Sequence, residues 1–190
     1  MKKVCIVGMG YVGLTLSMHA VRNGYDVHGI EILDSTFHQI SSGKTNFYEP
    51  GLEELLQLSL GISFHVYKDI PDDIRFDVFI ITVSTPLTGG TTKIPNMDFL
   101  DNSIRSIAPH VTLDSLVILR STIPVGSSAL VERQISKIKQ LDFIDISFCP
   151  ERTAEGKALV ELQSLPQIIS GNTDSALRKA RDFFEPLTDS

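Results

Sequence analysis

The chain has 190 residues, of which 42% are hydrophobic and 21% are charged, a balance that favours one globular domain and excludes disordered and fibrous classes. Its formal net charge of −6 argues against binding of nucleic acid, because proteins that bind a phosphate backbone depend on clustered lysine and arginine. The two cysteines, Cys5 and Cys149, argue against a disulfide framework and favour a reducing, cytoplasmic compartment. No apolar run approaches the roughly 18 residues that a membrane span needs, so we expect no membrane partner.

Short apolar runs rich in β-branched residues alternate with segments of helical length along the chain. The predicted strands are residues 2–8, 25–31, 62–67, 76–83, 115–121, 144–149 and 166–171. The predicted helices are residues 11–23, 35–40 with 52–59, 97–108, 125–140 and 175–184. Several strands are apolar throughout, as expected where both faces of a sheet are covered. The alternation predicts an α/β fold of the Rossmann type, with a doubly wound, mainly parallel sheet and helices on both faces.

Polar stretches rich in glycine and proline follow three strand or helix ends, at residues 43–51, 84–96 and 150–157. In an open parallel sheet, ligands bind at the carboxyl ends of the strands. The second and third stretches each follow a predicted strand, so we expect the chemistry of this protein to take place there.

A glycine pattern directly follows the first predicted strand. Gly8, Gly10 and Gly13 form G-x-G-x-x-G, with Tyr11 and Val12 between the last two glycines, and a predicted helix follows at once. In this context the first glycine permits a tight turn, the second lets the backbone approach a pyrophosphate, and the third lets the helix pack on the strand. Backbone N–H groups and the helix dipole then hold the phosphates without a lysine, which predicts a dinucleotide site at Gly8, Gly10, Tyr11, Val12 and Gly13.

An acidic residue, Glu31, ends the second predicted strand, 18 residues after Gly13. A carboxylate at this place accepts hydrogen bonds from the adenosine ribose and repels a 2′-phosphate. The following residues 32–35 contain no arginine that could bind such a phosphate. These features favour NAD over NADP as the cofactor. The alternative is a glycine-rich turn beside a solvent-facing glutamate, with no cofactor.

Five sequence blocks in this order resemble the UDP-glucose/GDP-mannose dehydrogenase family of nucleotide-sugar 6-dehydrogenases, from Lys3 to about Gly171. The blocks are GMGYVGL (8–14), YEPGLEELL (48–56), VSTPL (83–87), STIPVGS (121–127) and PERTAEG (150–156). The third block departs from the family's usual Val-Pro-Thr-Pro. The Glu-Arg pair of the last block, in place of Glu-Phe, is more similar to members that act on N-acetylated UDP-sugars than to those that act on UDP-glucose.

The resemblance implies two successive NAD-dependent oxidations at carbon six of a UDP-sugar, a UDP-N-acetylhexosamine or UDP-glucose, from alcohol to carboxylate. It places Thr122 and Glu151 where they would position and activate water, and Thr85 and Ser121 near the nicotinamide ribose or pyrophosphate. Glu151 suits this work if burial raises its pKa towards neutrality. Arg152 is a candidate to neutralise Glu151 or to contact substrate.

Simpler structural roles compete with these assignments. Ser121 or Thr122 ahead of Pro124 fits a helix N-cap, and Glu151 could be an exposed loop carboxylate. Cys149 closes an apolar strand and is expected to be a buried small side chain, because the family's reactive cysteine lies in a later domain. The histidines lack metal-ligand spacing, so we expect no metal site: they are His19, His28, His38, His65 and His110.

The resemblance also implies a domain organisation in which residues 1–190 form the NAD-binding domain. The family's central helix and C-terminal UDP-sugar domain would lie outside this chain, so we expect it to bind NAD with little or no turnover. The full-length protein is expected to be a homo-oligomer. A β-hydroxyacid-type dehydrogenase is an alternative that STIPVG and PERTAEG disfavour, and a non-catalytic NAD-binding module is another.

Overall fold

A six-stranded parallel sheet forms the centre of the computed structural model, which describes residues 2–89 and 93–190. The strand order is β3-β2-β1-β4-β7-β8, so the chain reverses direction across the sheet between β1 and β4. The strands are β1 (Lys3–Val7), β2 (Asp26–Ile30), β3 (Phe64–Tyr67), β4 (Val78–Ile81), β7 (Leu116–Leu119) and β8 (Asp145–Phe148). This order is that of a Rossmann sheet, which confirms the predicted fold class.

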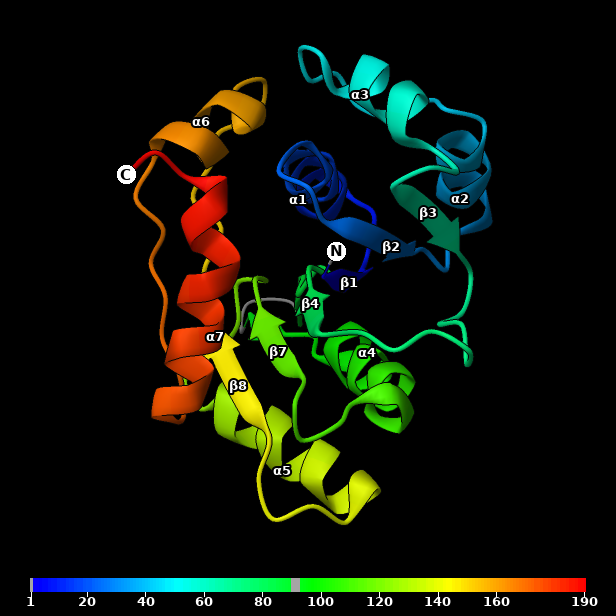
Figure 1. Cartoon of the computed structure of the whole chain (residues 1–190). Helices are drawn as coiled ribbons and strands as arrows, with labels where there is room; N and C mark the ends of the chain where they lie inside the picture. The colour runs from blue at the N-terminus through cyan, green and yellow to red at the C-terminus, as the bar shows by residue number, and fades with distance from the viewer. Residues whose placement is uncertain (1, 90–92) are drawn as a thin grey trace.

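Helices cover both faces of the sheet (Figure 1). One face packs against α1 (Tyr11–Arg22), α2 (Asp34–Ser41), α3 (Leu52–Ser59), α6 (Ala158–Ser164) and α7 (Asp174–Phe184). The other packs against α4 (Asp98–Ile107) and α5 (Ser127–Lys139), and single turns of 3-10 helix follow α4 and α7 at Ala108–His110 and Glu185–Leu187. Alternate residues of each strand face opposite layers, which explains why these strands are apolar throughout. No helix among the described residues is long and apolar enough to cross a membrane.

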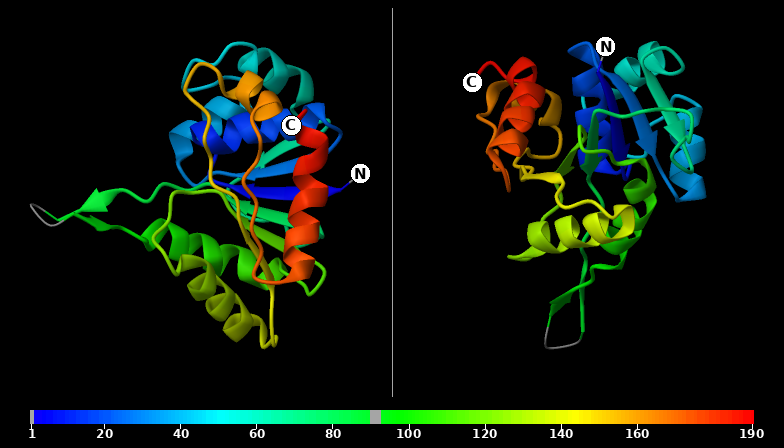
Figure 2. Two further views of the ribbon diagram at one scale, coloured as in Figure 1. Left: turned by 90° about the vertical axis from the view of Figure 1, so that its left-hand side faces the viewer. Right: turned by 60° about the horizontal axis from the view of Figure 1, so that its bottom comes forward.

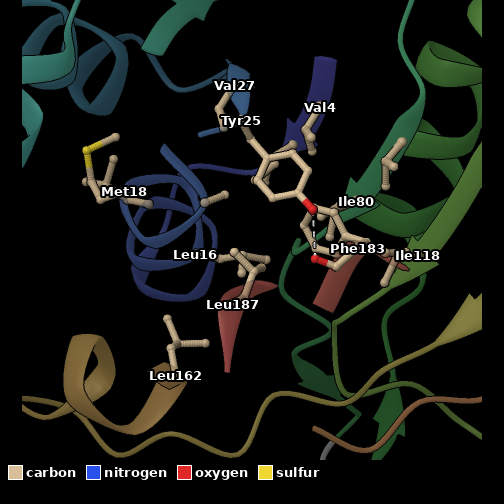
Figure 3. Close-up of a cluster of buried hydrophobic side chains, with 14 of the residues drawn as sticks. Val4, Leu16, Met18, Tyr25, Val27, Ile80, Ile118, Leu162, Phe183 and Leu187 are labelled. Atoms are coloured by element: carbon tan, nitrogen blue, oxygen red, sulfur yellow. Dashed lines mark hydrogen bonds between the residues drawn. The ribbon is translucent and has the colours of Figure 1, made fainter. Parts of the chain in front are cut away.

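The larger of the two apolar layers joins the sheet to α1 and α7 (Figure 3). Leu16 of α1 and Phe183 of α7 pack with Val27 and Ile80 of the sheet, and all four are almost completely buried. Tyr25 is buried with them, and its hydroxyl donates a hydrogen bond to the Phe183 carbonyl at 3.0 Å. This bond fixes α7 to the start of β2, whose other end lies beside Gly8 of the glycine pattern.

Removal of the Tyr25 hydroxyl tests this attachment. We expect Tyr25→Phe to lower the free energy of unfolding by about 1 kcal/mol, because a buried carbonyl loses its partner while the ring stays in place. Urea denaturation followed by circular dichroism measures the change. Tyr48→Phe is the matched control, since Tyr48 is 83% exposed. Equal losses in the two variants would contradict the assignment.

The predicted strand at residues 166–171 is wrong. This segment runs beside β8, but the Ser170 hydroxyl donates to the Phe148 carbonyl at 2.9 Å and accepts from the Phe148 N–H at 3.2 Å. The side chain therefore occupies backbone groups that a neighbouring strand would use. Pro166 also lacks an N–H to donate. The sheet accordingly ends at β8.

Three further features differ from the prediction. The helix α5 begins at Ser127 with Gly126 as N-cap, so neither Ser121 nor Thr122 caps it. The short helix α6 follows the stretch at residues 150–157 and was not predicted. An antiparallel pair, β5 (Leu87–Thr88) and β6 (Ile94–Pro95), projects from the domain as a hairpin (Figure 2). Residues 90–92 of the predicted loop lie outside the described residues.

Candidate functional site

The three fingerprint glycines each meet a different steric requirement. Gly8 directly follows β1 and has a φ of +95°, a conformation that favours glycine, and its N–H donates to the Ile30 carbonyl at 2.9 Å. A Cβ at Gly13 would lie 1.8 Å from the Gly8 carbonyl oxygen, so only glycine lets α1 come this close to the turn. At Gly10 an added Cβ would meet no atom within 4 Å. The space beside Gly10 is therefore open to a ligand.

The N-terminus of α1 faces this space with free backbone donors. Gly10 is the N-cap, no side chain caps the helix, and the first turn has no acidic residue. The first intrahelical bond runs from the Leu14 N–H to the Gly10 carbonyl at 2.9 Å, so the N–H groups before Leu14 have no partner within the helix. Such a turn fits a diphosphate without rearrangement. The Tyr11 side chain points elsewhere, to Glu49 and the Ala154 carbonyl.

Glu31 stands at the wall of a pocket of about 420 Å³ that extends from the glycine turn past the end of β2. Its side chain is buried, and its two oxygens accept the Met9 N–H at 3.0 Å and the Leu33 N–H at 2.8 Å. These bonds fix both the glycine turn and the carboxylate. An ionised carboxylate has about four acceptor sites, so Glu31 can still accept from ribose hydroxyls.

A cation that the sequence analysis missed lies at the same end of this pocket. Lys68 follows β3, and its ammonium group donates to the Ile32 carbonyl and, at 2.6 Å, to Asp34. The hydrogen bond from Lys68 holds the pKa of Asp34 below its ordinary value. Residues 32–35 contain no arginine, yet parallel pairing of β2 with β3 brings a lysine from 34 positions further along the chain.

A second pocket, of about 360 Å³, opens at the carboxyl ends of β4, β7 and β8. Residues 82–86, 120–122 and 151 line it together with Val12, so the loops after three strands meet where ligands were expected. The Thr85 hydroxyl donates to the Thr122 carbonyl and ties two of these loops together. Ser121 is buried and donates to the Ile81 carbonyl at 3.3 Å, whereas Thr122 is exposed.

Glu151, which is partly buried, forms an ion pair with the buried Arg120 in this pocket. The Arg120 Nε and Nη2 atoms donate to Glu151 Oε2 at 3.0 and 2.8 Å, and the backbone N–H groups of Arg152 and Thr153 donate to Oε1. Burial by itself would raise the pKa of Glu151. The Arg120 charge and these hydrogen bonds outweigh burial and hold the pKa below its ordinary value. The condition of a raised pKa is therefore not met, and Glu151 is ionised at neutral pH.

Arg120 is the main residue that the sequence analysis overlooked. It directly follows β7, is 1% exposed, and also donates to the Cys149 carbonyl and to Gln167, at 3.3 and 3.0 Å. Its guanidinium lies over the Phe184 ring at 5.1 Å. The Arg152 side chain instead reaches the Pro166 carbonyl, so Arg120 supplies the neutralising charge. An arginine at the end of an apolar strand was the available signal, because a buried charge requires a partner.

The cysteine thiols take no part in this site. Cys149 is completely buried beside Ser147, and burial raises the pKa of its thiol. Cys5 is buried in β1, and burial raises the pKa of its thiol strongly. Both thiols therefore stay protonated, which confirms the predicted packing roles.

A parallel sheet of this order, with a glycine turn after β1 and a carboxylate at the end of β2, defines a dinucleotide-binding domain of the dehydrogenase type. The sequence of residues 2–188 matches the model of the UDP-glucose/GDP-mannose dehydrogenase family, NAD binding domain. The chain belongs to this family and corresponds to its NAD binding domain.

Several relatives of this chain share one name. It is 30% identical over 187 residues to a UDP-N-acetyl-D-mannosamine dehydrogenase of Pyrococcus horikoshii, covering 96% of this chain and 44% of the relative. The enzyme of that name in Escherichia coli K12 is 28% identical over 96% of this chain and 45% of its own length. The chain thus spans less than half the length of these relatives.

Solved structures agree with this assignment. The UDP-N-acetylmannosamine dehydrogenases of Pyrococcus horikoshii and Staphylococcus aureus superpose with TM-scores of 0.90 and 0.89, each at 29% identity. Both alignments cover 99% of this chain, with 45% and 46% of the respective structures. A 3-hydroxyisobutyrate dehydrogenase superposes with a TM-score of 0.63 at 12% identity, which shows a shared fold only.

Proposed function

We propose that this chain is the NAD-binding part of a dehydrogenase that oxidises the carbon-six alcohol of a UDP-sugar to a carboxylate in two steps. The two pockets share Thr82, Val83 and Ser84 as a common wall, and this observation carries the proposal. An extended dinucleotide can run from Glu31, past the glycine turn, to the pocket that contains Glu151. The shared name of the relatives favours an N-acetylated sugar such as UDP-N-acetylmannosamine.

The described residues fit NAD at its adenosine and diphosphate ends. The backbone donors at the start of α1 would bind the diphosphate, and the open side of Gly10 leaves space for it. Glu31 would accept hydrogen bonds from the adenosine ribose. When bound, the nicotinamide ring supplies the hydride acceptor.

Thr122 and Glu151 are the proposed catalytic residues of this chain. Both line the second pocket, and Thr122 is exposed to it. Glu151 is ionised and therefore cannot act as an acid at neutral pH. Its acceptor sites, about four in a carboxylate, are filled by donors of Arg120, Arg152 and Thr153, so a water molecule would bind it by replacing one of these donors. Arg120 keeps Glu151 ionised. Thr85 and Ser121 support the same loops, and both are proposed to lie beside the nicotinamide ribose or pyrophosphate.

The remaining features of the full-length protein are proposals from the family. The relatives are more than twice as long as this chain, and we propose that residues acting on the sugar belong to the rest of the protein. Residues 1–190 would then bind NAD with little or no turnover by themselves. We also propose a cytoplasmic homo-oligomer that takes a UDP-sugar as substrate.

Titration of the chain with NAD and NADP by calorimetry tests the cofactor site. We expect NAD to bind at least about tenfold more tightly than NADP, because Glu31 repels a 2′-phosphate and Asp34 already neutralises Lys68. Glu31→Ala should weaken NAD binding by about 1 to 2 kcal/mol through loss of the ribose hydrogen bonds.

Glu31→Gln is the size-matched control for this titration. It keeps one acceptor oxygen for the Met9 N–H, while the charge and the acceptor of the Leu33 N–H are lost. The preference for NAD should therefore fall in this variant, with a smaller loss of thermal stability than in Glu31→Ala, which removes both acceptors. Equal affinity of the unaltered chain for both cofactors would refute the role of Glu31.

A further inference from the structure

Glu49 is a buried carboxylate in the loop before α3, within the YEPG block that the cofactor and the catalytic pocket leave unused. It is 5% exposed. Its Oε2 atom accepts hydrogen bonds from the Tyr11 hydroxyl at 2.8 Å and from the Gly156 N–H at 2.9 Å. Its Oε1 atom accepts from the Leu159 N–H at 3.3 Å. One side chain thus connects two distant segments. One lies near the start of the chain, and the other lies more than a hundred positions after Glu49.

The first of these segments is the start of α1. Tyr11 directly follows Gly10, and its ring packs against Phe47 with centroids 5.0 Å apart. Its hydroxyl also lies 3.0 Å from the Ala154 carbonyl. Burial and the hydrogen bond to Glu49 raise the pKa of Tyr11, so the phenol remains a donor at any physiological pH. Tyr11, at the helix start proposed to bind the diphosphate, therefore contacts the segment that contains Glu151 directly.

The second segment is the Glu151 loop, which we define as residues 150–157. Its first half is held by Arg120 through Glu151. Its second half is held by Glu49 through the Gly156 N–H, and by Glu161 through the Ala154 N–H at 2.7 Å. The loop contains no helix or strand, so these side-chain contacts take the place of a backbone ladder.

We propose that Glu49 is a positioning residue that, with Tyr11, fixes the Glu151 loop against the N-terminus of α1. The orientation of the proposed catalytic carboxylate is then set from the helix that holds the cofactor diphosphate. The positioning itself rests on the three hydrogen bonds of Glu49. Its importance for catalysis rests on the proposed function. The positioning role accounts for a buried acidic residue, Glu49, that lines neither the Glu31 pocket nor the Glu151 pocket.

Hydrogen exchange of the 190-residue chain, followed by mass spectrometry, tests the first step. In Glu49→Gln we expect the amides of Gly156 and Leu159 to exchange about tenfold faster, because each loses a charged acceptor. Tyr11→Phe, which removes one hydroxyl, should give a smaller increase at residues 154–156. Amides of β4 and β7 should be unchanged in both variants.

Glu53→Gln is the matched control, because Glu53 is a nearby carboxylate that accepts from the Thr45 N–H and not from the Glu151 loop. In Glu53→Gln, hydrogen exchange in the Glu151 loop should be the same as in the unaltered chain. Unchanged loop exchange in both Glu49→Gln and Tyr11→Phe overturns the proposal. An increase in exchange rate that is spread evenly over the sheet in Tyr11→Phe also overturns it. That result would show that the substitution destabilises the whole domain and does not act on the position of the Glu151 loop.

A titration of the Glu151 carboxyl by carbon NMR separates positioning from stability. The groups that face this carboxyl are the Arg120 side chain and the N–H groups of Arg152 and Thr153. If Glu49→Gln loosens the loop, those N–H groups move away and the midpoint rises towards the ordinary value. An unchanged midpoint overturns the proposal.

Binding of NAD distinguishes this inference from the proposed function. NAD should slow exchange in the Glu151 loop of the unaltered chain and should do so less in Tyr11→Phe. A chain that fails to bind NAD but shows the loosened loop in Glu49→Gln would refute the function and keep the positioning role. A chain that binds NAD with no effect of either substitution on the loop would refute the positioning role alone.

Discussion

Gly13→Ala is expected to destabilise the domain by about 3 kcal/mol, at the upper end of the cost of overpacking a core. A Cβ at this position would lie 1.8 Å from the Gly8 carbonyl oxygen and 2.7 Å from the Thr82 hydroxyl. Backbone cannot yield as a flexible side chain can, so α1 must move away from β1. Urea denaturation at neutral pH measures the loss, and NAD binding should fall with it because the donors at the start of α1 are displaced.

Gly10→Ala is the control for this prediction, in the same turn. Gly10 has a φ of −73°, which alanine adopts, and its Cβ would meet no protein atom within 4 Å. Stability should therefore change by less than about 0.5 kcal/mol. NAD binding should weaken by about tenfold or more, because the methyl group enters the space proposed for the diphosphate. Equal stability losses in the two variants would contradict this division of roles.

The sequence was sufficient to predict the sheet and the glycine turn because both depend on local patterns. Continuous apolar runs such as residues 78–81 mark strands that are covered on both faces, whatever their neighbours are. Gly8 and Gly13 are required by the geometry of the turn, and Glu31 follows at a spacing set by one helix and one strand. These features therefore needed no knowledge of tertiary contacts.

The charges around the site could not be assigned in this way, since they depend on which loops meet in space. Arg120 and Glu151 are 31 positions apart and pair because β7 and β8 are neighbours. The adjacent Arg152 was the natural partner in sequence and is not the partner in the structure. The segment 166–171 has strand-like composition, but the Ser170 hydroxyl occupies the backbone of Phe148. The spacing of apolar residues in a sequence does not show that a side chain will take the hydrogen bonds of a neighbouring backbone.

Arg120→Met is expected to cost about 3 to 5 kcal/mol of unfolding free energy at pH 7, because it leaves a buried carboxylate without its counter-charge. The side chains of Arg120 and Glu151 are only 1% and 11% exposed, so water can replace the lost partner only in part. The double variant with Glu151→Gln should recover part of this loss, since the buried charge is then removed. Glu151→Gln alone leaves the guanidinium with fewer acceptors and should also destabilise.

The pH dependence of the Arg120→Met penalty separates loss of charge from loss of packing. In the unaltered chain the pKa of Glu151 is lowered by folding, so its stabilising contribution is complete above the ordinary carboxyl range and is lost as the pH falls through the lowered value. In Arg120→Met, burial without the arginine raises the pKa of Glu151, so protonation relieves the penalty as the pH falls. The difference in unfolding free energy between the two proteins should therefore shrink between pH 7 and about pH 4. Urea denaturation at both pH values measures it, and a penalty of the same size at both would show that the guanidinium serves packing against Phe184 and not the charge of Glu151.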